Sequence, residues 1–176
     1  DNPETVLDLS GANFFKSPTE KANLENADLS NADFSNANLS EINMQNAKFK
    51  NSKFTGATLK NADLRKADLQ YVILESADLS GANLSDADLY SAVLSNANMS
   101  AVDLENSDLT EAILDKAYLT GANLVSARLP RASMIETQLS GAKLNYANLV
   151  ESDLTSANLN GAELKSAFMY KSKLVK

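Results

Sequence analysis

Hydrophobic residues recur at every fifth position through almost the whole chain. From Leu24 to Leu174, each of 31 consecutive centres is Leu, Phe or Met, with no insertion or deletion between them. Two residues before each centre stands Ala in 23 of the 31 cases, and Ser, Thr, Val or Ile in the others. A period of five fits neither a helix, which needs apolar spacing near 3.6, nor a strand, which needs strict alternation. The pattern therefore predicts a third geometry, in which the centre and the small residue before it both point inward across a short extended segment.

A coil with four such segments accounts for the pattern. If a corner follows each segment, four sides make a coil of 20 residues, and successive coils stack at the strand spacing of about 4.8 Å. All six glycines lie two residues after a centre, where a corner needs a backbone conformation that glycine adopts without steric cost. The sequence thus predicts an all-β repeat in which residues 20 positions apart form columns.

The pattern is weakest in residues 1–21, where Thr19 occupies a centre. The flanking centres keep their spacing, so the phase of the repeat survives. We interpret residues 1–21 as an irregular first coil or cap and residues 22–176 as the repeat domain, because solenoids need covered ends. Segment 15–18 is expected to loop out or to fold over the open end, with a binding loop as the alternative. Three phenylalanines are expected to stack in one interior ladder: Phe14, Phe34 and Phe54.

The repeated phrase Ala-(Asp/Asn)-Leu-x-x, as in Ala22-Asn23-Leu24 and Ala27-Asp28-Leu29, resembles the repeat of the pentapeptide repeat family. The resemblance covers residues 22–176, with a weaker start at Leu7-Asp8-Leu9. It implies a right-handed parallel quadrilateral β-helix of about eight coils. It implies less about function, because one fold hosts several activities.

The composition excludes several kinds of chemistry. The chain has no Cys and no His, which removes disulfides, thiol catalysis and the commonest general base and metal ligand. Carboxylate pairs such as Asp86 and Asp88 are expected to lie outward on a convex rod, whereas catalysis needs a concave pocket. We therefore predict a protein that is not an enzyme and that has no catalytic residues, cofactor or metal.

No apolar run approaches the roughly 20 residues of a membrane span, so we expect none. The compartment is left open because the sequence begins at Asp1. The cytoplasm is one alternative, and the thylakoid lumen or periplasm is the other if a removed targeting segment preceded Asp1.

Charge is unevenly distributed in a chain with a net charge of −7. Residues 48–66 contain six bases and one acid, which we interpret as a solvated surface rather than a phosphate-binding patch. Residues 67–115 contain ten acids and no base. Within this stretch the 20-residue spacing stacks three aspartates on one side. With two neighbouring acids they form the predicted acidic belt: Asp68, Asp88, Asp108, Asp103 and Glu105.

Three aliphatic residues interrupt the outward Asp/Asn positions. Ile73, Val93 and Ile113 follow one another at intervals of one coil and should form a vertical stripe, which we call the apolar stripe. Ile135 nearly continues it, and Tyr118 lies on the next side. An aligned set of exposed apolar residues can mark an interface, although β-branched residues also suit strand ladders.

Two functions are consistent with these features. The first is a rigid, rod-like scaffold that binds another protein and no nucleic acid. By resemblance, the alternative is a DNA mimic that binds DNA gyrase or topoisomerase and gives quinolone or antibiotic resistance. The acidic belt favours mimicry, whereas the basic segment 48–66, the mixed charge after Lys116 and the lack of an inserted loop count against it.

By the same resemblance, a head-on homodimer is expected through the C-terminal end. The candidate contact residues are Phe168, Met169 and Tyr170. The alternative is that three lysines within residues 171–176 blunt this strand edge and prevent association.

Overall fold

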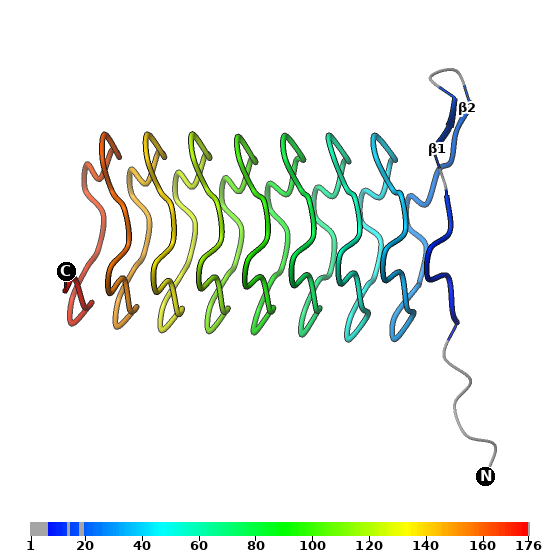
Figure 1. Cartoon of the computed structure of the whole chain (residues 1–176). Helices are drawn as coiled ribbons and strands as arrows, with labels where there is room; N and C mark the ends of the chain where they lie inside the picture. The colour runs from blue at the N-terminus through cyan, green and yellow to red at the C-terminus, as the bar shows by residue number, and fades with distance from the viewer. Residues whose placement is uncertain (1–6, 14, 18–19, 176) are drawn as a thin grey trace, which may run out of the picture.

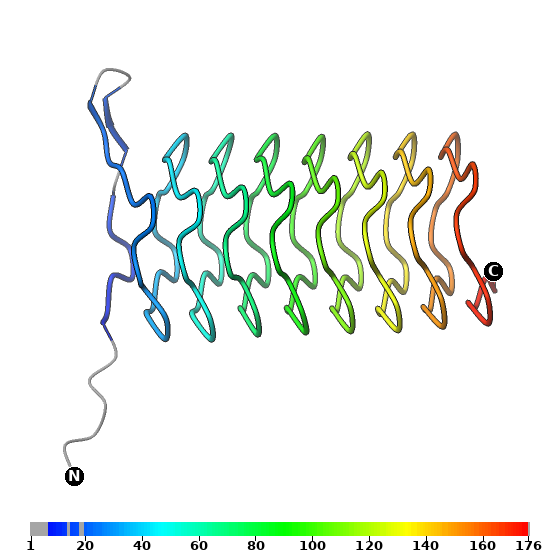
Figure 2. The same ribbon diagram turned by 180° about the vertical axis from the view of Figure 1, so that it is seen from behind.

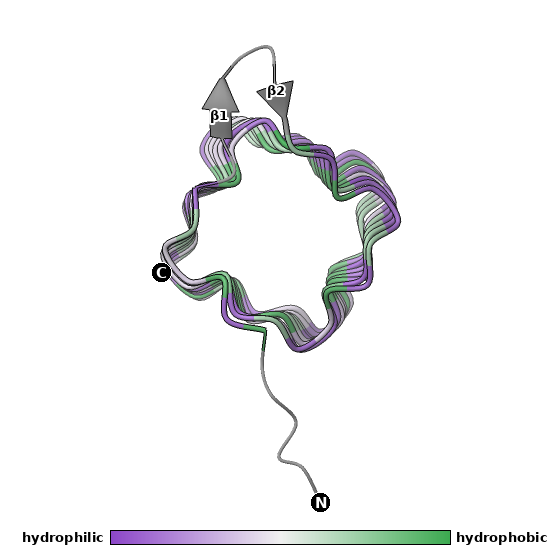
Figure 3. Cartoon of the chain, turned by 90° about the vertical axis from the view of Figure 1, so that its right-hand side faces the viewer, coloured by the Kyte–Doolittle hydropathy of each residue, from purple (hydrophilic) through white to green (hydrophobic). Residues whose placement is uncertain are grey.

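The computed structural model describes residues 7–13, 15–17 and 20–175 and shows a β-solenoid. Short parallel bridges join residues 20 positions apart, from Asn23 with Asn43 to Asp153 with Lys173. The coils stack along one axis (Figures 1 and 2), and a view along that axis shows a four-cornered outline (Figure 3). The predicted 20-residue period is therefore confirmed. The right-handed sense that the resemblance implies stays a prediction.

We name the four sides A to D after the centres Leu24, Leu29, Phe34 and Leu39, and each side includes the equivalent centres of the later coils. The centres and the small residues before them fill the interior, and from Ala32 to Leu149 they are buried. The rings of Phe34 and Phe54 stack with centroids 4.8 Å apart, while Phe49 meets both edge-on. The interior is therefore a packed core of aliphatic and aromatic side chains, as the pattern predicts.

Buried hydroxyls in this core are all hydrogen-bonded. Where Ser replaces Ala, its hydroxyl donates to the backbone carbonyl three residues earlier, as from Ser52 to Phe49 at 2.6 Å and from Ser107 to Leu104 at 2.7 Å. Thr137 donates instead to the carbonyl of Leu114 at 2.9 Å. These substitutions for Ala therefore leave no polar group unsatisfied in the core.

The corner residue, two positions after each centre, has a positive φ between 52° and 70°. At most turns a hydrogen bond runs from the amide three residues after the centre to the carbonyl of the centre, as from Ala27 to Leu24 at 3.1 Å. This combination is typical of a type II turn. The glycines lie at corners as expected, but Asn, Ser, Lys, Glu and even Tyr71 adopt the same conformation at other corners.

The first coil is longer than the others. Asp8 pairs with Asp33 and Asn13 with Asn38, so both bridges span one repeat more than the bridges of the later coils. The additional residues lie in a hairpin of strands β1 (Phe15–Ser17) and β2 (Glu20–Lys21), which pair antiparallel and project sideways from the stack (Figures 1 and 2).

This register changes one expectation about the core. The amide of Leu9 donates to the carbonyl of Asp33 at 2.7 Å, so Leu9 begins the column that continues with Phe34 and Phe54. Phe14, expected in that column, lies outside the described residues. Residues 7–13 already pair with the next coil, and the division into a cap (1–21) and a repeat domain (22–176) stays a prediction.

Candidate interaction surfaces

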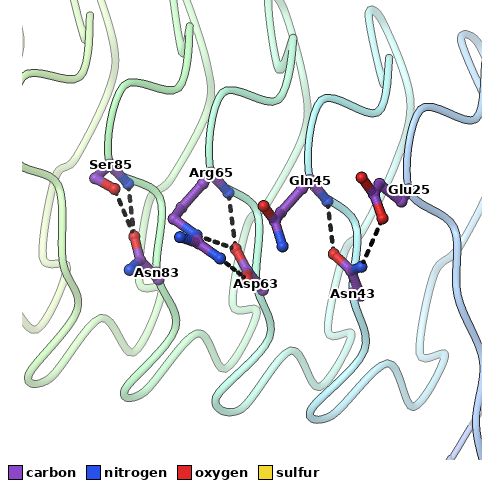
Figure 4. Close-up of polar contacts among 7 residues, drawn as sticks. All are labelled: Glu25, Asn43, Gln45, Asp63, Arg65, Asn83 and Ser85. Atoms are coloured by element: carbon purple, nitrogen blue, oxygen red, sulfur yellow. Dashed lines mark hydrogen bonds and ion pairs between the residues drawn. The ribbon is translucent and has the colours of Figure 1, made fainter.

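One recurrent hydrogen bond explains why Asp or Asn precedes most centres. Its side-chain oxygen accepts the amide of the residue after the centre, as from Gln45 to Asn43 at 3.2 Å and from Ser85 to Asn83 at 2.9 Å (Figure 4). The backbone ladder between coils does not use this amide. The arrangement is an Asx turn that, wherever Asp or Asn forms it, satisfies the last free backbone donor of the segment. Our sequence reasoning missed this role, although the fixed position of Asp and Asn next to a corner was the signal for it.

Hydrogen bonds lower the pKa of two of these carboxylates, Asp63 and Asp153. The Arg65 guanidinium, 2.7 Å from Asp63, holds the pKa of that carboxyl below its usual range (Figure 4). The Thr155 hydroxyl, together with the Lys173 ammonium 2.9 Å away, lowers the pKa of Asp153 to about 2. These aspartates are therefore ionised acceptors that support the turns.

The aspartate column of the acidic belt lies on side B. Asp68, Asp88 and Asp108 occupy successive parallel bridges, and the column continues to Lys48 at one end and Arg128 at the other. Arg128 Nε lies 3.6 Å from Asp108 Oδ2. The column is thus three carboxylates long and is bounded by bases at both ends.

The other two acids of the belt lie on side A. Asn123 Nδ2 donates to Asp103 Oδ1 at 2.9 Å and to Glu105 Oε2 at 3.2 Å. The belt is therefore divided between two sides and does not form one acidic face.

Bases from neighbouring coils reach further acids of residues 67–115. Lys60 Nζ lies 3.2 Å from Asp78 Oδ2, and Arg131 Nη2 lies 2.6 Å from Glu111 Oε1. Exposed pairs of this kind contribute about 0–1 kcal/mol each to stability. Their main effect is therefore to reduce the local negative charge.

An aromatic and charged cluster lies at the corner between sides B and C. The rings of Tyr71 and Tyr90 meet edge-on with centroids 5.6 Å apart, and the Tyr90 hydroxyl donates to Glu111 Oε2 at 2.8 Å. The hydrogen bond from Arg131, followed by that from Tyr90, lowers the pKa of Glu111, while Glu111 raises the pKa of Tyr90. Sequence reasoning missed this cluster because Tyr90 comes from a different position of the repeat than the corner residues that it contacts.

The apolar stripe lies on side C as its spacing predicts. Ile73, Val93 and Ile113 occupy adjoining parallel bridges. The first two side chains are half-buried between their neighbours, and Ile113 is 39% exposed. The stripe is continuous over three coils, with Lys53 before it and Ser133 after it in the same column.

The two residues expected beside the stripe lie apart from it. Ile135 is half-buried, and its amide donates to Asp115 Oδ1 at 3.0 Å, while Ser133 Oγ donates to the same oxygen at 2.6 Å. This polar contact separates Ile135 from the stripe. Tyr118 is 53% exposed on side D, where it lines a shallow hollow with Lys116 and Glu136.

At the C-terminal end, Phe168 and Tyr170 point outward and are 62% and 68% exposed. Met169 lies between them as an inward centre and packs against the core. The Lys171 ammonium lies 5.2 Å from the centre of the Tyr170 ring. A hollow of about 460 Å³ opens at this end, with apolar lining from Leu154, Leu159, Leu174 and Val175.

Within residues 7–13, 15–17 and 20–175, no three acidic, His or Cys side chains are grouped closely enough to hold a metal ion. The same part of the chain has no long apolar helix that could cross a membrane.

Comparisons with known proteins give one family match and several similar solved structures. No curated protein matches the chain. It is similar to the solved structure of HetL, a pentapeptide repeat protein involved in heterocyst differentiation regulation from the cyanobacterium Nostoc sp. strain PCC 7120. That match has 27% identity over 96% of this chain and 85% of HetL, with a TM-score of 0.46.

Two further solved structures are similar to the chain. Rfr23, a pentapeptide repeat protein from the cyanobacterium Cyanothece 51142, is 36% identical over 55% of this chain and 63% of its own, with a TM-score of 0.45. QnrB1, a plasmid-mediated fluoroquinolone resistance protein, is 20% identical over 93% of this chain and 92% of its own, with a TM-score of 0.47. The sequence model of the family described as pentapeptide repeats matches residues 8–46, 42–81, 72–106, 97–134 and 132–170. The five-residue phrase, the 20-residue coil and this match together show that the chain belongs to the pentapeptide repeat family.

Proposed function

We propose that this protein is a non-enzymatic rod that binds another protein through its side. The apolar stripe carries the proposal, because it places three aliphatic side chains in adjoining positions on an otherwise polar face. The packed interior supports it further, since the surface around a filled rod is convex and suits contact with a macromolecule better than enclosure of a substrate. Aligned apolar surface of this kind marks interaction sites in other proteins.

The local backbone hydrogen bonding gives no reason for the stripe. At most outward positions Asp or Asn accepts the amide of the residue after the centre. In the described part of the chain, the amides of Glu75, Ser95 and Asp115, which follow the three stripe residues, have no such acceptor. The aliphatic residues therefore replace side chains that would satisfy these donors.

The test changes the charge of the stripe without changing the fold. Val93→Asp introduces the residue type that the repeat favours at this position, so the solenoid should stay folded. Asn148→Asp adds the same charge on side B and keeps the oxygen that accepts the Val150 amide, so it serves as the control. Proteins retained by the immobilised wild-type chain should be lost with Val93→Asp and kept with Asn148→Asp. Equal retention by the two variants would remove the stripe as the contact surface.

The aspartate column favours a second candidate, mimicry of DNA towards gyrase or topoisomerase. Its carboxylates repeat at about 4.8 Å, against one phosphate per roughly 3.4 Å along each DNA strand. The bases that bound the column at Lys48 and Arg128 count against it. If mimicry is right, the protein should inhibit or protect gyrase in a supercoiling assay, and Asp88→Lys combined with Asp108→Lys should abolish the effect. An unaffected enzyme would dismiss this candidate.

The end-to-end homodimer is a separate proposal. The exposed rings of Phe168 and Tyr170 and the apolar hollow at the same end of the solenoid support it. Light scattering of residues 1–176 should give twice the mass of one chain, and Phe168→Glu should return it to a single chain. A monomeric wild-type protein would end this proposal without affecting the side contact.

A further inference from the structure

We infer that the partner of the apolar stripe is an amphipathic α-helix with basic flanks, lying parallel to the axis of the solenoid. The inference rests on the proposed side contact and specifies its chemistry. The observations that carry it are the direction and spacing of the stripe and the charges beside it.

The stripe runs along the solenoid axis, across three coils. Its side chains therefore follow one another at about 4.8 Å, and Ile73 lies about 9.6 Å from Ile113 along the axis. On a helix, residues i, i+3 and i+7 rise by about 4.5 Å and 10.5 Å, so one helical face can meet all three stripe residues. On an extended strand, residues on the same face are about 6.6 Å apart, so the first and third would be about 13.2 Å apart. This distance does not match the stripe length of about 9.6 Å. The spacing favours a helix over a strand.

The surface beside Val93 leaves room for a helix. The outward residues before and after it in the same coil are Ser91 and Ser95, which are small and half-buried. The coils on either side carry larger residues at the equivalent positions, including Tyr71 and Glu111. The two serines allow the partner's backbone to come closest at the middle of the stripe.

The charged residues that directly flank the three stripe residues are acidic. Glu75 is exposed, and in the described part of the chain its carboxylate has no assigned hydrogen bond or ion pair. Asp115 and Glu111 flank Ile113, although Asp115 already accepts from Ser133 and Glu111 is paired with Arg131. The nearby bases are Lys53 at the head of the column, Lys116 at the corner beyond Asp115, and Lys50, whose ammonium lies 5.6 Å from the centre of the Tyr71 ring. Lys or Arg on the flanks of the partner helix would therefore meet Glu75 first.

The experiment uses the full chain and two fluorescent synthetic peptides of about 14 residues. Both contain the same numbers of Leu, Lys and Ala. In one, Leu recurs at i, i+3, i+4 and i+7, and in the other Leu alternates with Lys as in a strand. Fluorescence anisotropy then gives the affinity of each peptide for the wild type and for Val93→Asp, Glu75→Lys and Asn148→Asp.

The helical peptide should bind in the micromolar range and at least about tenfold more tightly than the alternating one. Val93→Asp should weaken it about tenfold although it adds an acid, which separates stripe binding from general attraction to an acidic protein. Glu75→Lys should weaken it several-fold, and Asn148→Asp should leave the affinity unchanged.

Three results would overturn the inference. If the alternating peptide binds as tightly and remains sensitive to Val93→Asp, the stripe is a contact surface but its occupant is not a helix. If neither peptide binds, the helix is excluded, and the side contact still depends on the retention experiment above. If both peptides bind wild type and Val93→Asp with the same affinity, the stripe is not the contact surface, and the proposed helical partner is rejected with it.

Discussion

A corner residue of this solenoid has a left-handed backbone conformation, whichever side chain it carries. That conformation costs about 1–2 kcal/mol for a residue with a Cβ atom. Ala101 and Gly121 occupy stacked corners of side D with φ values of 55° and 67°. A Cβ atom added at Gly121 would meet nothing within 4 Å, so the space around it does not require glycine. The backbone conformation alone therefore decides which residue is more stable there.

Exchanging these two residue types should change stability in opposite directions. Gly121→Ala should lower the free energy of unfolding by about 1 kcal/mol, and Ala101→Gly should raise it by a similar amount. Urea denaturation followed by circular dichroism measures both. Thr120→Gly, at a position without positive φ, is the control and should destabilise. A stabilising Gly121→Ala would contradict the backbone argument.

The low pKa of Asp153 predicts an acid-dependent contribution to stability. The folded value of about 2 lies below the ordinary value of 3.8. A depressed folded pKa contributes stability above the unfolded pKa, and this stability is lost as the pH falls from about 4 to about 2. The difference in unfolding free energy between wild type and Asp153→Asn should shrink across this window. A difference that is constant from neutral pH to pH 2 would show that the Thr155 and Lys173 contacts do not stabilise the ionised form.

At the scale of the element, each side of the coil is a three-residue segment between two turns. Its stability depends on inward packing and on satisfied backbone donors. The Asx turn supplies the last acceptor at most positions, whereas the apolar stripe omits it. In the three coils that carry the stripe, the side C segment is therefore less completely hydrogen-bonded than the segments on the adjacent sides.

Restoring that acceptor should compensate for the loss of a valine. Val93→Asn loses packing in the ladder and gains a hydrogen bond to the Ser95 amide worth about 1 kcal/mol, so its stability should stay close to wild type. Val93→Ala loses the packing without the gain and should be about 1 kcal/mol less stable. Thermal unfolding of the two variants tests the difference. Asn and Ala variants of equal stability would mean that solvent satisfies this amide as well as a side chain does.

The period of five was sufficient to predict the columns. Because each coil consists of four repeats, Ile73, Val93 and Ile113 could be placed in one line without coordinates. An irregular first coil was expected, but its additional repeat could not be predicted, because the flanking centres keep their spacing of five and nothing marks one repeat as lying outside the coil. The contacts between coils, such as Tyr90 with Glu111, depend on side-chain rotamers at the corners, which a column assignment does not specify. The partner could not be predicted at all, since the repeat fixes the shape of the surface and not its ligand.

At the scale of the molecule, the solenoid is a one-dimensional stack in which each coil contacts only its neighbours. A residue such as Leu94 lies between coils on both sides and is fully buried. Leu164, near the C-terminal end, is only partly buried against the core. The same side chain therefore contributes differently according to its position along the axis.

Truncating these two leucines should show that gradient. Leu94→Ala should cost about 3 kcal/mol or more, because it leaves a cavity enclosed by neighbouring coils, and Leu164→Ala roughly half as much. Equilibrium unfolding in urea measures both, and a lower m-value for Leu94→Ala would show that the stack separates into two parts. Equal losses would mean that burial in the end coil is as complete as in the middle.

The hairpin β1–β2 has a consequence for how this molecule can be altered. The chain leaves the stack after side D, returns before side A, and resumes the same pairing afterwards. A segment inserted between two sides is thus compatible with regular stacking of the coils. New loops carrying a binding sequence could be grafted at other corners, where they would stand out from the shaft as β1 and β2 do and leave the packed centre intact.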